Sequence, residues 1–100
     1  MAYRIEYLPS AVTDILEAEA GLYEFNPAAA NKFTNEIRRL TETLCEHPQM
    51  YQIYKDDDYF RSMSLPYHYR LFYHVVRETE TIKIYRVIHG MRDLGKALCD

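Results

Sequence analysis

The stretch YHYRLFYHVVRETETIKIYRVI, residues 67–88, decides the fold because it reads as two consecutive β-strands. Apolar and aromatic residues recur at every second position on both sides of RETE, residues 77–80, which is the spacing of strands with one buried face. A connection of this length suits antiparallel neighbours. The same alternation occurs upstream in YFRSMS, before Leu65 and Pro66. We therefore predict an antiparallel meander of residues 59–64, 67–76 and 81–88.

Alternation along the middle strand assigns its side chains to two faces. One face, expected to pack under helices rather than to stack nucleobases, carries Leu71 and Val75 with Tyr67, Tyr69 and Tyr73. The opposite, open face carries Arg70, Phe72 and His74. In the last strand, the same spacing places Ile84, Arg86 and Ile88 together, opposite Tyr85, Val87 and His89. Glu6 is a candidate partner for Arg70 or Arg86, because an arginine in an apolar strand needs an anion.

The first half of the chain predicts one strand and two helices. YRIEYL, residues 3–8, alternates like a short strand. Ser10 can then cap a helix whose apolar residues are Val12, Ile15, Leu16, Leu22 and Tyr23. Asn26 before Pro27 predicts the start of a second helix, whose narrow apolar stripe is Ala30, Phe33, Ile37, Leu40 and Leu44. Residues 10–46 are thus expected to form a helical hairpin.

These elements predict a single α+β domain over residues 1–100. Its order is strand, helix, helix and three strands, followed by a short helix or frayed turn at 91–100. The helical hairpin should cover one face of an antiparallel sheet, to which residues 3–8 add a strand. Residues 47–58, with three aspartates, are expected to form a solvated loop.

Composition excludes several classes of protein. A net charge of −3 and a pI near 5.8 give no general positive field for nucleic acid. Cys45 and Cys99 have no metal-ligand spacing, and His68 and His74, about 20 Å apart on one strand, cannot share a metal. Without a signal-like or membrane-spanning segment, we expect a cytoplasmic protein with reduced thiols, no cofactor and no membrane partner.

The end of the last strand carries a polar cluster around one glycine, with His89, Arg92 and Asp93. Two interpretations remain open. The cluster can be a functional site, or His89 can hydrogen-bond a loop carbonyl while Arg92 and Asp93 pair near a helix start.

The second half of the chain resembles the RelE/ParE toxins of bacterial type II toxin–antitoxin systems. The residues that carry the resemblance are Tyr69, Arg70, Leu71, Tyr73, Val75, Ile82, Ile84, Val87, His89, Gly90, Arg92 and Asp93. Element order and length agree with this family over essentially the whole chain. The resemblance implies a RelE/ParE-like fold and a toxin of a plasmid-stabilisation system, held inactive by a cognate antitoxin that wraps its surface. The resemblance is compatible with two assemblies, a homodimer and a heterotetramer with the antitoxin.

The family contains two activities, and both remain open for this chain. RelE-like members cleave mRNA in the ribosome, and by resemblance the catalytic candidates are His89 as acid or base, with Arg61, Arg70 and Arg92 as phosphate clamps. Met63 and Gly90 depart from that pattern, and the catalytic tyrosine near the C-terminus is absent, with Lys96 near its place.

ParE-like members inhibit DNA gyrase, and His89 followed by Asp93 matches their last strand. This activity needs no catalytic residue, so gyrase inhibition is the favoured prediction. A third hypothesis is a non-toxic module that only binds the antitoxin.

Overall fold

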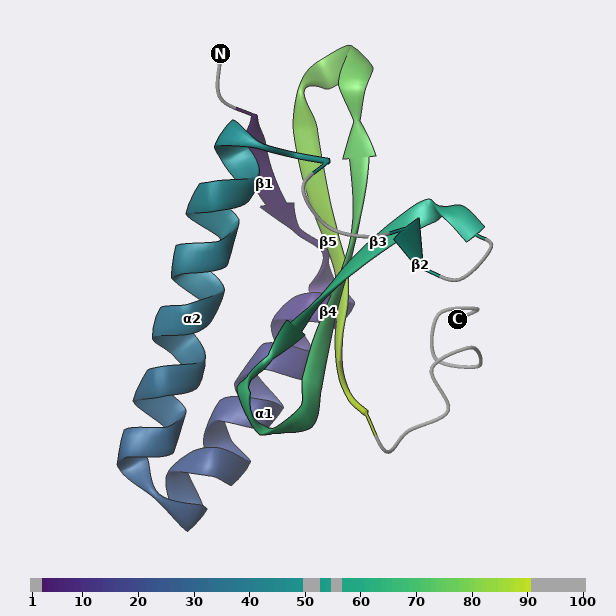
Figure 1. The fold of residues 1–100 in the computed structure, drawn as a ribbon. Helices are drawn as coiled ribbons and strands as arrows, with labels where there is room; N and C mark the ends of the chain where they lie inside the picture. Colours follow the sequence, from purple (N-terminus) through teal and green to yellow (C-terminus); the bar gives the residue numbers. More distant parts are fainter. Residues whose placement is uncertain (1–2, 50–52, 55–56, 91–100) are drawn as a thin grey trace.

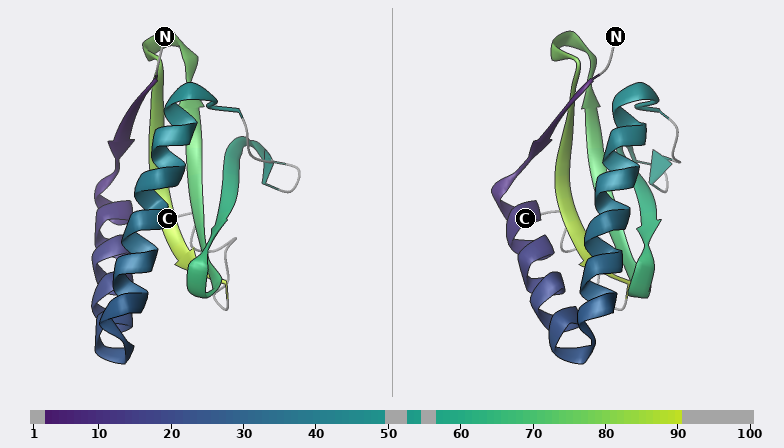
Figure 2. Two further views of the ribbon diagram at one scale, coloured as in Figure 1. Left: turned by 60° about the vertical axis from the view of Figure 1, so that its left-hand side comes forward. Right: turned by 90° about the vertical axis from the view of Figure 1, so that its left-hand side faces the viewer.

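A five-stranded sheet and a helical hairpin form the two layers of the molecule (Figures 1 and 2). The structure is a computed structural model that describes residues 3–49, 53–54 and 57–90. The elements are β1 (Arg4–Tyr7), α1 (Pro9–Phe25), α2 (Pro27–Glu46), β2 (Ile53–Tyr54), β3 (Asp57–Leu65), η1 (Pro66–His68), β4 (Tyr69–Val76), η2 (Arg77–Thr79) and β5 (Thr81–His89). The α+β class and the predicted order of the main elements are confirmed. The helix or turn expected at 91–100 lies outside the described residues.

The sheet has the order β1-β5-β4-β3-β2, so the first strand lies beside the last. Strands β3, β4 and β5 form the predicted antiparallel meander. Strand β1 joins it as predicted, but it runs parallel to β5, which makes the sheet mixed. Residues 53–54, expected in a loop, pair with β3 as a two-residue strand because their backbone satisfies the edge of that strand.

A single residue, Asn26, connects the two helices of the hairpin and caps both of them. Its backbone N–H donates to the carbonyl of Leu22 and closes α1, while its side chain accepts from the N–H of Ala28 at 3.0 Å and opens α2. The N-terminus of α1 differs from the prediction. The helix begins at Pro9 after Leu8, and Ser10 donates its hydroxyl to the carbonyl of Tyr85 instead of capping. Proline is favoured at the first helical position because its missing N–H is not needed there.

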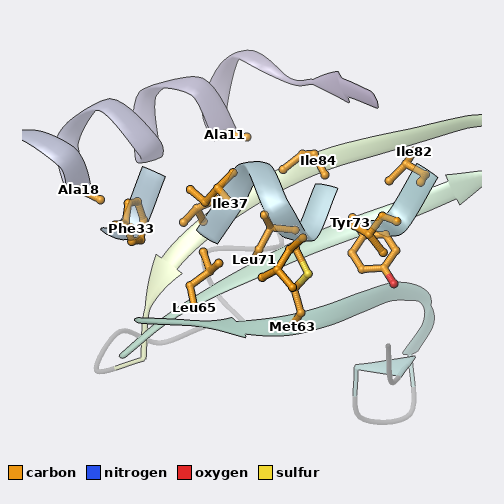
Figure 3. Close-up of a cluster of buried hydrophobic side chains, with 13 residues drawn as sticks. Ala11, Ala18, Phe33, Ile37, Met63, Leu65, Leu71, Tyr73, Ile82 and Ile84 are labelled. Carbon is orange, nitrogen blue, oxygen red and sulfur yellow. The ribbon is translucent and has the colours of Figure 1, made fainter. Parts of the chain in front are cut away.

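The main core lies between the helices and the sheet (Figure 3). The predicted stripe of α2 is buried as expected: Ala30, Phe33, Ile37, Leu40 and Leu44. For α1 the predicted face is confirmed only in part: Ile15 and Leu22 pack against the core, but Val12, Leu16 and Tyr23 are exposed. Ala11 and Ala18, which the prediction left out, are buried instead. Helix α1 packs on β5, and small side chains such as those of Ala11 and Ala18 permit close packing at such a contact.

A β-bulge changes the direction of side chains in β5. Phe72 pairs with Arg86 but Tyr73 pairs with Ile84, so Tyr85 is an extra residue between two registers. Ile84 therefore faces the helices, whereas Ile88 packs on the other face beside Phe72. The sequence prediction that Ile84 and Ile88 share a face was wrong for this reason.

Candidate functional site

Arg70 lies on the open face of the sheet, as predicted from its position between Tyr69 and Leu71. Its two terminal nitrogens donate to the hydroxyls of Ser62 at 3.1 Å and Ser64 at 3.2 Å, both on β3. No carboxylate forms an ion pair with Arg70 among the side chains that the structure describes. The guanidinium is half-buried and held by neutral groups, which suits it to receive an anion.

His89 ends β5 on the helix-covered side. Its ring meets Tyr69 edge-to-face at 5.1 Å between centroids and lies 6.1 Å from His68. A hollow of about 220 Å³ brings it together with Asp14 and Glu17 of α1.

Gly90 lies where the chain passes close to η1, and this close approach favours a residue without a side chain. The N–H of Gly90 donates to the carbonyl of His68 at 2.6 Å, and a Cβ at position 90 would lie 3.1 Å from that oxygen. The turn itself is unusual, because Tyr67 and His68 have φ of 65° and 67°. Strand β4 therefore begins at Tyr69, and the prediction that placed His68 on the same strand as His74 was wrong.

The predicted catalytic residues do not come together within the described part of the chain. Arg61 pairs with Tyr73 on the helix side of the sheet, and its guanidinium donates to the carbonyl of Gln49 at 3.4 Å. Arg70 faces the open side, and His89 lies near Arg70 along the sheet but on the other face. From the pairing of Arg61 to that of His89, the distance along β4 is four residues, or about 13 Å. Arg92 lies outside the described residues.

Arg86 forms an ion pair with Asp14 of α1. Glu6, the candidate partner for Arg70 or Arg86, forms no ion pair with either arginine among the described side chains. The Nε of Arg86 lies 2.7 Å from one carboxylate oxygen of Asp14 and its Nη2 lies 3.1 Å from the other. The N–H of Val87 also donates to Asp14 at 3.0 Å. This bidentate pair joins α1 to β5 over 72 residues of chain, so no local pattern in the sequence revealed it.

An aromatic cluster covers the other end of the open face, and no pattern in the sequence singled it out. Tyr59 stacks on His74 with centroids 3.7 Å apart, and the Nδ1 of His74 lies 2.7 Å from the carbonyl of Tyr59. The hydroxyls of Tyr59 and Tyr85 lie 2.6 Å apart, and Phe60 packs beside both rings. Burial, together with this hydrogen bond, raises the pKa of Tyr85 to about 12.

An apolar groove of about 310 Å³ runs between the two helices and β1. Val12 and Leu16 are 42% and 60% exposed there, beside Ile15, Ile37 and Tyr7. Burial raises the pKa of Tyr7, although its hydrogen bond with Thr41 opposes the shift. Glu19 and Arg38 provide opposite charges along the groove. An apolar segment with polar flanks would fit this surface.

The described residues contain neither a candidate metal site nor a helix suited to cross a membrane. Among residues 3–49, 53–54 and 57–90, no group of three or more histidine, cysteine, aspartate or glutamate side chains could hold a metal ion. In the same part of the chain, neither helix has the length and apolar character needed to cross a bilayer.

Solved structures share this fold at low sequence identity. A chain from the chromosomal ParDE system of P. aeruginosa aligns with a TM-score of 0.71 and 15% identity, covering 88% of this chain and 96% of that one. A chain of the intact E. coli RelBE complex gives 0.66 and 16%, covering 91% and 100%. A chain of RelBE2 from Mycobacterium tuberculosis gives 0.61 and 19%, covering 89% and 99%. These likenesses define the fold as that of the RelE/ParE toxins, whereas no curated protein matches the sequence.

The family follows from the sequence itself. Residues 5–94 match the family model described as the ParE toxin of the type II toxin–antitoxin system parDE. The match covers nine tenths of the chain, so the protein belongs to the ParE toxin family. The resemblance inferred from the second half of the sequence is thus confirmed.

Proposed function

We propose that this chain is a toxin that inhibits DNA gyrase and is neutralised by a cognate antitoxin protein. The observation that carries the proposal is the match to the ParE toxin model over residues 5–94. The separation of Arg61, Arg70 and His89 over two faces of the sheet also supports it, because gyrase inhibition requires no catalytic cluster. The chain is proposed to act in the cytoplasm, where gyrase is found.

The exposed apolar groove supports the antitoxin part of the proposal. Val12 and Leu16 belong to a contiguous group of apolar side chains and are not isolated on the surface. Contiguous exposed apolar surface is typical of protein-binding sites. An amphipathic helix with apolar residues at spacings of three and four would fill it. Similar solved structures include the intact E. coli RelBE toxin–antitoxin complex and an E. coli RelE mutant bound to a peptide of its antitoxin.

The target is tested by adding the purified chain to DNA gyrase with relaxed plasmid. We expect loss of supercoiling and accumulation of cleaved DNA, and in cells a DNA-damage response after expression without antitoxin. His89→Ala and Arg70→Ala should retain both effects, because neither residue is a catalyst under this proposal. Gyrase activity that is unchanged at a large molar excess of the chain would contradict the proposal.

Ribosome-dependent mRNA cleavage is the second candidate. It is favoured by the likeness to RelE chains and by the location of Arg70 and His89 near the same end of the sheet. Under this alternative, His89 and Arg70 with Arg61 and Arg92 provide acid–base and phosphate contacts. New mRNA 5′ ends within translated codons, lost in His89→Ala while the fold is retained, would establish it. If neither DNA damage nor new ends appear, the non-toxic antitoxin-binding module becomes the better explanation.

A further inference from the structure

The setting of Arg70 is that of a positioned cation whose described partners carry no charge. Its two terminal nitrogens each donate to a serine on β3, and Ser62 and Ser64 lie at alternate positions on the same face of that strand. The two hydroxyls orient the guanidinium but add no negative charge. Orientation without neutralisation leaves the group ready to form strong, charge-assisted hydrogen bonds to an anion.

Glu36, the acidic side chain that lines a hollow together with Arg70, is engaged with another arginine. Glu36 lines the hollow of about 410 Å³ beside Ser62 and Arg70, but it is bound by Arg39, with Nη2 and Oε2 2.8 Å apart. This hydrogen bond lowers the pKa of Glu36, because it stabilises the carboxylate that is paired with Arg39. Asp14 holds Arg86 in the same way. Within the described side chains, Arg70 has only serine hydroxyls as partners.

A second hollow beside Arg70 has room for an acidic side chain together with neighbouring atoms of its peptide. It measures about 370 Å³, and Arg70 opens onto it with Ser64, Leu65, His68, Tyr69 and Gly90. Leucine and tyrosine beside a single guanidinium suit a carboxylate on an apolar peptide. A nucleic-acid strand would instead need several cations along its path, and Arg61 and Arg86 are engaged elsewhere, with Gln49 and Asp14.

We propose that Arg70, positioned by Ser62 and Ser64, is an anchor for an aspartate or glutamate side chain of the antitoxin on the open face of the sheet. The identity of the partner rests on the proposed function. The carboxylate would accept two N–H groups of the guanidinium in a bidentate pair, as Asp14 does from Nε and Nη2 of Arg86 within the chain. Arg70 thus supplies charge recognition, and the apolar groove between the helices supplies buried area.

The test is isothermal titration of the full chain with the antitoxin that is co-expressed with it, purified separately. Arg70→Gln should raise the dissociation constant by about 10- to 100-fold, since a charge-assisted pair is lost. Arg70→Lys should recover only part of the affinity because an ammonium cannot form the bidentate pair. Arg77→Gln, the same change just past the opposite end of β4, is the matched control and should alter binding by less than about 2-fold.

A double-mutant cycle identifies the antitoxin residue. Each acidic residue of the antitoxin is neutralised in turn, and one of them should lose its effect when Arg70 is already glutamine. Melting curves confirm that each variant is folded. Antitoxin affinity that is equal in the parent chain and Arg70→Gln would overturn the anchor and leave the toxin–antitoxin function standing. No binding by the parent chain would overturn both.

A nucleic-acid phosphate is the competing ligand and has its own arm. A fluorescent single-stranded RNA of ten nucleotides is titrated with the same variants. We expect no change between the parent chain and Arg70→Gln. RNA affinity that falls in Arg70→Gln while antitoxin affinity stays constant would overturn the proposal and assign Arg70 to phosphate.

Discussion

Arg86 and Arg70 stand on neighbouring strands, but their surroundings differ. Arg86 is bound by Asp14 and joins β5 to α1, with side chains only 19% and 9% exposed. Arg70 contacts two serine hydroxyls on the face of the sheet that points away from α1 and α2. Figure 2 shows both of these helices on the other face of the sheet. Arginine thus contributes to the stability of the fold where the chain supplies a carboxylate for it, and under the proposal above it binds a partner where the described side chains supply none. Two of four predictions test this difference directly, and the other two compare a packed residue with an exposed one.

The largest effect is expected on the helix-covered side. Leu71 is fully buried between the sheet and the helices, so Leu71→Ala should lower the free energy of unfolding by about 2 to 5 kcal/mol. Leu16→Ala makes the same chemical change at a residue that is 60% exposed, and it should cost less than about 1 kcal/mol. Urea denaturation measures both. Equal losses in the two variants would mean that Leu16 is packed as tightly as Leu71.

The next effect comes from the ion pair of Arg86. Asp14→Ala removes the carboxylate and leaves both the guanidinium and the N–H of Val87 without this acceptor, at a cost of about 2 to 4 kcal/mol. Glu36→Ala breaks the exposed pair with Arg39 and should cost less than about 1 kcal/mol. Thermal or chemical denaturation compares the two. An Asp14→Ala variant as stable as Glu36→Ala would remove the cohesive role of Arg86.

A smaller effect is expected at Arg70. Arg70→Met removes two hydrogen bonds to serines but also a half-buried charge that has no counter-ion among the described side chains. These changes offset each other, so stability should stay within about 1 kcal/mol of the parent chain. Denaturation of the isolated toxin measures this. A loss above about 2 kcal/mol would show that Arg70 is needed for cohesion after all.

The smallest effect is expected from the aromatic cluster at high pH. Tyr85 has its pKa raised from 10.0 to about 12, so the folded state holds the phenol proton more tightly than the unfolded state does. This contribution to stability is therefore complete below the ordinary pKa and declines as the pH rises from there toward the folded value. Between about pH 10 and pH 12, the parent chain should lose more stability than Tyr85→Phe. The exposed Tyr23→Phe should behave like the parent chain, and identical alkaline curves for all three would contradict the assignment.

Local patterns in the sequence predicted the elements but not every face. The stripe of α2 and the two faces of β4 were predicted correctly, because each depends on unbroken periodicity. The face of α1 was predicted only in part: Ile15 and Leu22 pack against the core, but Ala11 and Ala18 were missed because alanine carries a weak apolar signal. The change of sheet face between Ile84 and Ile88 was missed, because a β-bulge has no reliable signature in a single sequence.

For the candidate site, the sequence predicted the residue types but not their arrangement. Arg61, Arg70 and His89 were singled out together, and their distribution over two faces depends on strand register, which a shift of one residue reverses. Their catalytic role stays a prediction. The pairing of Arg86 with Asp14 and the hydrogen bond of Tyr59 to Tyr85 join distant segments, so only packing could bring them together.

The sequence by itself determined the α+β fold class, the order of the main elements and the membership of the ParE toxin family. These properties depend on residue types and on their spacing along the chain. The tertiary structure decided which arginine is neutralised by a described carboxylate, which apolar residues of α1 form a groove, and how β1 pairs with β5. The physical reason is that charge pairing, burial and strand direction depend on neighbours that lie far apart in the sequence and meet only on folding.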